Sequence, residues 1–166
     1  MADLLNADEI FAIAIQIETN GAEFYRKAAA QHQDADQQQA LLDLAGMEHE
    51  HARTVKQMRE DLQGGANAAE VDPRQEGGLF LSSVVSGYRV EGSPAVADQL
   101  SGDESMQRIL EIGLDLEKQA VLFYLGLKDV TTVDDAREKI DRIIDEEKKH
   151  VVFFTEELEK VKGAAA

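Results

Sequence analysis

Apolar residues recur at intervals of three and four positions along four stretches of the chain, separated by polar segments. In the first two stretches they are Ile10, Phe11, Ala14, Ile15, Ala22 and Tyr25, then Leu41, Leu44, Met47, Val55, Met58 and Leu62. In the last two they are Ile109, Leu110, Leu114, Val121, Tyr124 and Leu125, then Ile140, Ile143, Ile144, Val151 and Phe154. This spacing places each set on one face of an α-helix, so four amphipathic helices are predicted.

Each stretch begins near a helix-start signal, in which a short polar side chain precedes an acid or amide by three residues. The four pairs are Asn6 with Glu9, Asp34 with Gln37, Ser101 with Glu104, and Thr132 with Asp135. Only two prolines occur in the chain, which also favours helices.

The connections between these helices predict how they are arranged. The segments "QHQDA" and "DVTTV" are short, which is typical of antiparallel helical hairpins. Residues 64–102, by contrast, form a long connection rich in Gly, Ser, Asn and Asp, long enough to let the second and third helices run parallel. Within it, "LFLSSVVSGY" (79–88) is apolar enough to lie against the bundle, and we expect a short helix there, with an extended segment as the alternative. The prediction is an all-α, single-domain chain over residues 1–166, similar to the ferritin-like four-helix bundles with one long crossover.

Composition narrows the possible partners. The formal net charge of −16 would repel phosphate backbones, so we expect no nucleic-acid partner. The negative charge could serve solubility alone, or it could bind cations. Cysteine is absent, which excludes disulfides and thiolate-bound metals in this chain and is compatible with a cytoplasmic location. No signal peptide is evident, and the apolar runs are too short to cross a bilayer, so no membrane partner is expected.

An internal repeat relates the two predicted hairpins. The segment "IETNGAEFY" (17–25) resembles "LEKQAVLFY" (116–124), so that Glu18 matches Glu117 and Tyr25 matches Tyr124. The same offset of 99 residues relates two Glu-x-x-His motifs, Glu48 with His51 and Glu147 with His150. The chain therefore looks like two copies of one helical hairpin.

Hairpin geometry brings the repeated acids to one level. Glu18 and Glu48 are equidistant from residue 33 in the first connection, and Glu117 and Glu147 are equidistant from residue 132 in the second. Residues equidistant from the turn of an antiparallel hairpin lie at the same height, and residues three apart share a helix face. Four carboxylates and two imidazoles would then meet in the core, where two divalent cations could neutralise the acids.

Other interpretations apply to the single motifs. One Glu-x-x-His pair in a glutamate-rich chain is weak evidence and is more often an ordinary surface pair. Tyr25 and Tyr124 lie about 10 Å along the helix from the glutamates of their own segments, so we expect core residues or partners of the ligands rather than ligands. A further set is expected in solvent, namely His32, His49, Glu50, Glu146, Glu156 and Glu157.

The segments "IETNGAEFYRKAA", "LAGMEHEHA", "LEKQAVLFY" and "IIDEEKKHVVFF" together resemble the rubrerythrin-like branch of the ferritin-like superfamily. This resemblance implies two non-haem iron ions, with manganese or zinc as alternatives. It implies that one iron is held by Glu18 and His51, the other by Glu117 and His150, and that Glu48 and Glu147 bridge them. The family's chemistry is oxidation of ferrous iron by oxygen or hydrogen peroxide.

The chain departs from the family pattern in two ways. It has no cysteine for the iron–sulfur module of rubrerythrins, so the resemblance implies a separate electron-donor protein. Leu114 stands where rubrerythrins have a further glutamate, which leaves six ligands, closer to a ferroxidase-type set. Three functions stay open: a di-iron oxidoreductase, an iron-storage protein, and a metal-bearing structural or partner-binding bundle that uses residues 79–88. A homodimer or higher homo-oligomer is expected.

Overall fold

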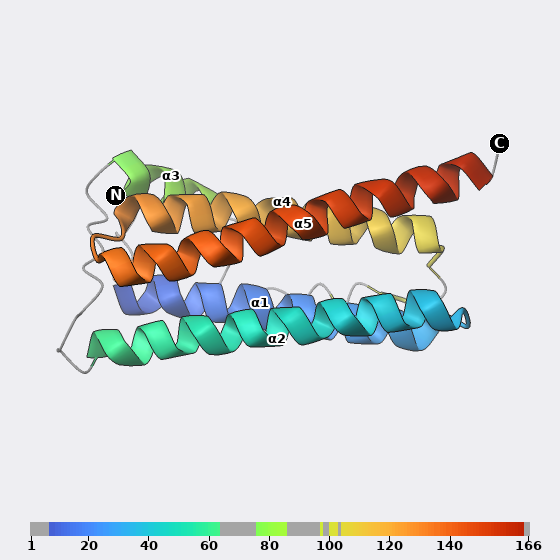
Figure 1. Cartoon of the computed structure of the whole chain (residues 1–166), viewed down its shortest axis with the longest axis horizontal. Coiled ribbons are helices and arrows are strands. Elements are labelled where there is room, and N and C mark those ends of the chain that lie inside the picture. Colours follow the sequence, from blue (N-terminus) through green and yellow to red (C-terminus); the bar gives the residue numbers. More distant parts are fainter. Residues whose placement is uncertain (1–6, 64–75, 86–96, 98–99, 103, 165–166) are drawn as a thin grey trace.

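Five α-helices make up the described part of the chain in the computed structural model, which describes residues 7–63, 76–85, 97, 100–102 and 104–164. The helices are α1 (Ala7–Gln31), α2 (Ala35–Gln63), α3 (Glu76–Val85), α4 (Met106–Val130) and α5 (Asp134–Ala164). Figure 1 shows α1 with α2 and α4 with α5 as antiparallel hairpins, and α2 and α4 run in the same direction. The predicted all-α bundle with one crossover is therefore confirmed. No helix among these residues combines the length and apolarity that a membrane crossing requires.

The helix starts agree with the sequence signals in part. The backbone N–H of Gln37 donates to the Asp34 carboxylate at 2.9 Å, as predicted for a helix cap. The helix start predicted at Ser101 and Glu104 is wrong, because these two residues bond to each other in a turn ahead of the helix. The cap of α4 is Ser105, whose hydroxyl accepts from the Arg108 N–H.

The two remaining starts have different outcomes. α5 begins at Asp134, two residues after the predicted cap Thr132, which is within the usual uncertainty of a helix end. Asn6 lies outside the described residues.

The core consists of two apolar clusters at opposite ends of the bundle. One contains Ile10, Phe11, Val55, Phe123, Leu127 and Ile140, among others. The second contains Phe24, Leu41, Leu44, Ile109, Phe154 and Leu158, among others. Two residues predicted for the buried stripes are instead exposed, Met47 at 39% and Leu125 at 40%. Both lie at the margin of their stripe, where a helix with a narrow apolar face turns toward solvent.

The short helix α3 packs against α4. Its residues 79–85 confirm the expected helix, whereas residues 86–88 lie outside the described residues. Leu81 is buried in the first cluster, next to Gly126, where an added Cβ would lie 3.3 Å from Leu81 Cβ and 3.0 Å from a Phe80 ring carbon. Gly126 therefore lets α3 approach α4 closely.

Two helical glycines give a paired prediction on stability. A Cβ added at Gly113 would lie 2.6 Å from Phe154 Cε1, and the buried Phe154 ring is stacked on Tyr25, so it has no free space to move into. We expect Gly113→Ala to lower the free energy of unfolding by about 1–3 kcal/mol. A Cβ at Gly46 meets nothing within 4 Å, so Gly46→Ala should raise the free energy of unfolding by up to about 1 kcal/mol through helix propensity alone. Urea unfolding of both variants measures the difference, and equal stabilities would contradict the packing at Gly113.

Candidate metal centre

All six predicted ligand residues are buried and meet at one level of the bundle, between the two apolar clusters. They are Glu18 from α1, Glu48 and His51 from α2, Glu117 from α4, and Glu147 and His150 from α5. Each main helix of the bundle thus contributes a carboxylate to the same region. Helical periodicity explains the arrangement, because each glutamate lies on the apolar face that its helix buries.

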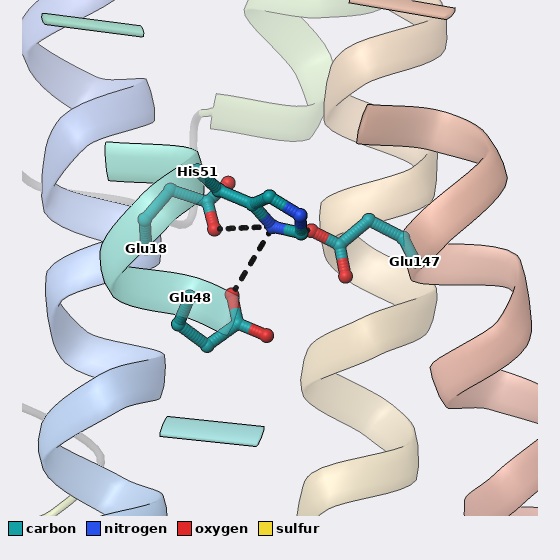
Figure 2. Close-up of side chains that lie close together, drawn as sticks. All are labelled: Glu18, Glu48, His51 and Glu147. Carbon is teal, nitrogen blue, oxygen red and sulfur yellow. Dashed lines mark ion pairs between the residues drawn. The ribbon is translucent and has the colours of Figure 1, made fainter. Parts of the chain in front are cut away.

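The six side chains form two overlapping groups, and in each group the nearest ligand atoms lie within 4.8 Å of one another. The His51 group consists of Glu18, Glu48, His51 and Glu147. The His150 group consists of Glu48, Glu117, Glu147 and His150. Figure 2 shows the His51 group, with its carboxylates gathered around the imidazole. Glu48 and Glu147 belong to both groups, so the geometry suits two adjacent cations.

The two shared carboxylates each turn one oxygen toward each histidine. Glu147 Oε1 lies 3.0 Å from His51 Nδ1, and its Oε2 lies 3.1 Å from His150 Nδ1. Glu48 Oε2 lies 3.8 Å from His51 Nδ1, and its Oε1 lies 3.4 Å from His150 Nδ1. A carboxylate that presents separate oxygens to two positions has the geometry of a bridging ligand.

The unshared carboxylates face one histidine each. Glu18 Oε2 lies 3.5 Å from His51 Nδ1, and Glu117 Oε2 lies 3.3 Å from His150 Nδ1. The two imidazole rings lie 6.0 Å apart between centroids, at 25° to each other. Both histidines therefore direct Nδ1 into the cluster, one toward each half.

Several buried polar atoms of this cluster have no hydrogen-bond partner among the described residues. They are Glu18 Oε2, Glu48 Oε1, His51 Nδ1 and Glu147 Oε1. His51 Nδ1 and Glu147 Oε1 approach to 3.0 Å, but without hydrogen-bond geometry. Buried polar atoms normally have a partner, and unpaired ones are costly. Carboxylate oxygens and an imidazole nitrogen that converge without partners fit divalent metal ions.

Burial and the histidines divide the four carboxyl groups into two kinds. Burial raises the pKa of Glu18 well above its ordinary range and raises the pKa of Glu117 to about 8. Burial also opposes ionisation of Glu48, but the two nearby histidines outweigh it and lower the pKa to about 2. The same competition lowers the pKa of Glu147. Without metal at neutral pH, the shared carboxylates are charged and the unshared ones hold protons.

The two histidines are charged under the same conditions. Burial favours the neutral imidazole, but the close surrounding carboxylates outweigh it. They raise the pKa of His51 strongly and the pKa of His150 to about 12. In the metal-free site, the two imidazolium groups thus balance the two ionised carboxylates.

Comparison with known proteins gives a family for this arrangement. The family model for rubrerythrin matches residues 9–158. The chain belongs to the rubrerythrin family. No curated protein matches its sequence.

Two crystal structures share the fold of this rubrerythrin-family chain. A protein from Thermotoga maritima, described as a candidate ferritin-like diiron-carboxylate protein, is 22% identical, with a TM-score of 0.71 over 97% of this chain and 99% of that one. KatB, a manganese catalase from Anabaena PCC7120, is 17% identical, with a TM-score of 0.60 over 98% of this chain and 77% of that one. At these identities the likeness shows a ferritin-like fold.

Two buried tyrosines contact the unshared carboxylates of the centre. The Tyr25 hydroxyl donates to Glu117 Oε1, and the Tyr124 hydroxyl donates to Glu18 Oε1. Each tyrosine thus contacts the glutamate of the other repeat. Side chains of a helix point back toward its N-terminus, which brings each hydroxyl to the level of the acids although its Cα lies two turns away. Both tyrosines are buried in the core, and each contacts a glutamate that is predicted to be a ligand.

The sequence pattern did not predict one contact of the centre. Glu146, expected as a surface charge, accepts a hydrogen bond from His51 Nε2 at 2.7 Å. Its side chain is 49% exposed, so it reaches the buried imidazole from the surface. The matching position of the other repeat is Met47, which has no carboxylate to offer His150. The repeat could have suggested this difference, because Glu146 and Met47 are an unmatched pair next to matched acids.

The other residues expected in solvent have mixed outcomes. His49, Glu50 and Glu156 are exposed, as predicted. Glu157 is half-buried and accepts from Lys160. The expectation for His32 was wrong, because the residue is half-buried in the turn after α1 and its Nε2 atom is shielded from solvent.

Removal of the Glu146 carboxylate should weaken metal binding at the His51 group. A carboxylate on the outer nitrogen fixes the imidazole orientation and keeps Nδ1 unprotonated toward the metal. Loss of such a partner typically lowers metal affinity about 10–100-fold. We therefore expect Glu146→Ala to lower the affinity for one of two Mn²⁺ ions by this factor, as measured by calorimetry. Glu50→Ala is the control, because Glu50 is an exposed acid of α2 paired with Arg53. Equal affinities in both variants would contradict the role of Glu146.

Proposed function

We propose that this rubrerythrin-family protein binds two iron ions and couples oxidation of ferrous iron to reduction of hydrogen peroxide or oxygen. The observation that carries this proposal is the set of unpaired oxygen and nitrogen atoms converging in the buried core. In this assignment the unshared ligands are Glu18 with His51 and Glu117 with His150, and the bridging ligands are Glu48 and Glu147. Four carboxylates then balance the charge of two divalent ions.

The chain's own residues prepare the site for this chemistry. Two ferrous ions, when bound, supply the two electrons that convert one hydrogen peroxide and two protons into two waters. The Tyr25 and Tyr124 hydroxyls hold the unshared carboxylates in place, and burial keeps the pKa of each hydroxyl well above its ordinary value. Both phenols therefore stay protonated and act as hydrogen-bond donors. The apolar clusters on either side keep bulk water away from the centre.

The donor set leaves the choice between iron and manganese open to experiment. Carboxylate oxygen and imidazole nitrogen suit both metals, and zinc can occupy such sites. The two structural neighbours are described as a diiron-carboxylate protein and a manganese catalase, which supports either metal. A manganese form that dismutates peroxide is therefore our second candidate function.

The proposal includes a cytoplasmic location, a separate electron-donor protein and a homo-oligomeric assembly. We infer the separate electron-donor protein from the lack of cysteine in this chain, which cannot hold an iron–sulfur cluster on thiolates. Iron storage would require a closed hollow shell, so particle size distinguishes it from a small oligomer. A purely structural bundle would bind metal without redox turnover.

Anaerobic loading with ferrous iron, followed by stopped-flow mixing with peroxide or oxygen, tests the proposal. Elemental analysis should give about two irons per chain, because four carboxylates balance two divalent ions. Mixing with either peroxide or oxygen should then oxidise the bound iron in a single kinetic phase. Protein loaded with zinc is the matched control, because zinc occupies the same ligands but has no redox chemistry. A folded sample that retains no iron, or iron that peroxide and oxygen leave ferrous, would refute the assignment.

A further inference from the structure

The metal centre is nearly sealed, and the small exposure that remains is uneven among its carboxylates. The side chains of Glu18 and Glu147 are 0% exposed, whereas those of Glu48 and Glu117 are 5% and 3% exposed. Both histidines are also slightly exposed, His51 at 4% and His150 at 5%. Among the carboxylates, solvent therefore reaches Glu48, which both groups share, and Glu117 of the His150 group.

A small pocket between α1 and α4 accounts for this exposure. Its volume is about 30 Å³, and its lining includes Asn20, Gly21, Tyr25, Glu48, Leu116 and Glu117. Glu48 and Glu117 supply polar atoms at its inner end, and Tyr25 lies beside them. Asn20 and Leu116 are half-buried and form its outer rim. The pocket thus connects the surface of the bundle to two carboxylates of the centre.

Gly21 keeps this pocket open. A Cβ added there would lie 3.4 Å from Glu48 Cγ and 3.6 Å from Glu48 Oε2, within the space between α1 and the carboxylate. In the internal repeat Gly21 matches Ala120, which lines the same pocket from α4. The helix α3 also packs on α4 in that half of the bundle, where Leu81 and Tyr124 share one cluster. The pocket is therefore lined from both repeats, but the carboxylates that line it are Glu48 and Glu117 and not their repeat partners Glu147 and Glu18.

We propose that the pocket at Gly21 is the entrance and binding site for the small oxidant, which reaches the centre at the Glu48 and Glu117 carboxylates of the His150 group. This inference rests on the proposed function and adds the route and the size limit of the substrate. A water molecule needs about 10–15 Å³ of such space, so a pocket of about 30 Å³ accepts molecules of two or three heavy atoms. Hydrogen peroxide and oxygen fit this limit, whereas organic hydroperoxides do not.

A rival route among the described residues is an open groove of about 750 Å³ between α2 and α5. Among the six site residues, only His150 lines this groove, together with Gly46, Met47 and Glu146 at its surface. A molecule in the groove would meet the edge of an imidazole and no ligand carboxylate. The pocket at Gly21, in contrast, is lined by two ligand carboxylates and the tyrosine that contacts one of them.

Matched leucine substitutions distinguish the two routes. Gly21→Leu fills the pocket between α1 and α4, and Gly46→Leu places the same side chain in the groove between α2 and α5. Both proteins are loaded with two metal ions, and the association rate of azide is measured by stopped-flow absorption. We expect Gly21→Leu to slow azide association about tenfold or more, because entry then waits for a local opening of the helices. Gly46→Leu should leave the rate within about twofold of the wild type.

The size limit has its own measurement. Wild-type protein should react with hydrogen peroxide much faster than with tert-butyl hydroperoxide, and Gly21→Leu should slow the reaction with hydrogen peroxide itself. If Gly21→Leu does not fold or does not keep two metals, Gly21→Ala replaces it, since its Cβ makes an ordinary contact with Glu48. A severalfold slower azide association is then expected.

The outcomes separate this inference from the proposed function. An unchanged azide rate in the Gly21 variants, or a slower rate in Gly46→Leu alone, overturns the entrance while the redox function stands. Equal rates with both hydroperoxides overturn the size limit. Wild-type protein that holds two metals but neither binds azide nor reacts with hydrogen peroxide overturns the proposed function and the entrance together.

Discussion

Loading the site with two divalent metal ions at pH 7 is expected to release about four protons per chain. In the metal-free protein, burial keeps Glu18 and Glu117 protonated, because their pKa values are raised, the second to about 8. His51 and His150 are protonated as well. Metal ligands must be deprotonated, so two carboxyl protons and two imidazolium protons leave when both ions bind.

Charge neutrality gives the same number. Without metal, two ionised carboxylates and two imidazolium groups sum to zero. With metal, four ionised carboxylates carry −4 and two divalent ions carry +4, which again sums to zero. The buried site therefore exchanges four units of proton charge for four units of metal charge. An incomplete exchange would leave net charge in the apolar core, which is costly.

The sign of the pH dependence follows from these raised pKa values. Groups that hold protons at pH 7 compete with the metal, so the metal affinity rises with pH and levels off above the pKa of each group. About two protons are displaced per metal, which predicts roughly a hundredfold gain in affinity per pH unit near neutrality. The dependence weakens first above pH 8, where Glu117 has lost its proton.

Mn²⁺ titration in a weakly buffered solution with a pH indicator measures the proton count. Calorimetry in two buffers of different ionisation enthalpy provides an independent count. Glu156→Ala, a change at an exposed acid of α5, should release the same number of protons as the wild type. Release of fewer than about one proton per chain at full loading would show that the histidines are neutral and the carboxylates charged before metal binds.

The fold and the convergence of the six candidate ligand residues could be predicted because both depend on backbone periodicity. Glu18 and Glu48 lie at one height because they are equidistant from the turn, and this relation needs no knowledge of side-chain packing. His51 follows Glu48 by three residues and so shares its face. The same glutamates and histidine recur 99 residues later, so the same reasoning applies to the second hairpin.

The contacts around the ligands could not be predicted, because they depend on how far side chains reach between helices. The helical pattern placed Tyr25 two turns from Glu18 but did not reveal that its hydroxyl contacts Glu117. Glu146 lies on a solvent-facing position of α5, so periodicity assigned it to the surface although it contacts His51. Likewise, the effect of the small residue Gly21 on the pocket depends on how α4 lies opposite α1, which periodicity does not determine.

The helix-start error has a comparable cause. Ser101 and Glu104 satisfy the spacing of a capping box, and they do bond to each other. Gly102 has φ of +107°, a conformation that few other residues adopt, so the chain turns there instead of entering the helix. Ser105 is four residues closer to the apolar stripe than Ser101 and forms the cap. Two competing signals four residues apart are beyond what spacing alone can decide.

The largest difference among site variants is expected between shared and unshared carboxylates. Glu48→Ala or Glu147→Ala should impair both metal positions, because each of these side chains directs separate oxygens toward both histidines. Glu18→Ala or Glu117→Ala should mainly weaken one position. Removing an unshared ligand also leaves the cation pair less well neutralised, so a smaller effect on the other position is expected.

These variants should remain folded, which makes the comparison interpretable. Glu18 Oε2, Glu48 Oε1 and Glu147 Oε1 have no hydrogen-bond partner among the described residues, so their removal relieves a buried, unpaired acceptor. Glu48 and Glu147 are also the ionised partners of two charged histidines, and their loss leaves a buried positive charge unbalanced. We therefore expect the metal-free Glu18→Ala protein to be more stable than metal-free Glu48→Ala. Helicity and melting temperature of each metal-free variant establish this order before metal is added.

Metal content and peroxide-dependent iron oxidation in the four single variants then decide the assignment. We expect close to zero bound metals for the Glu48 and Glu147 variants under conditions in which the Glu18 and Glu117 variants keep about one, since a bridging ligand serves both ions. Oxidation by hydrogen peroxide should be lost in all four, because two electrons require both irons. A Glu18→Ala protein that loses both metals, together with a Glu48→Ala protein that keeps one fully, would reverse the roles of the two carboxylates. Two irons and unchanged oxidation rates in all four variants would place the metal elsewhere.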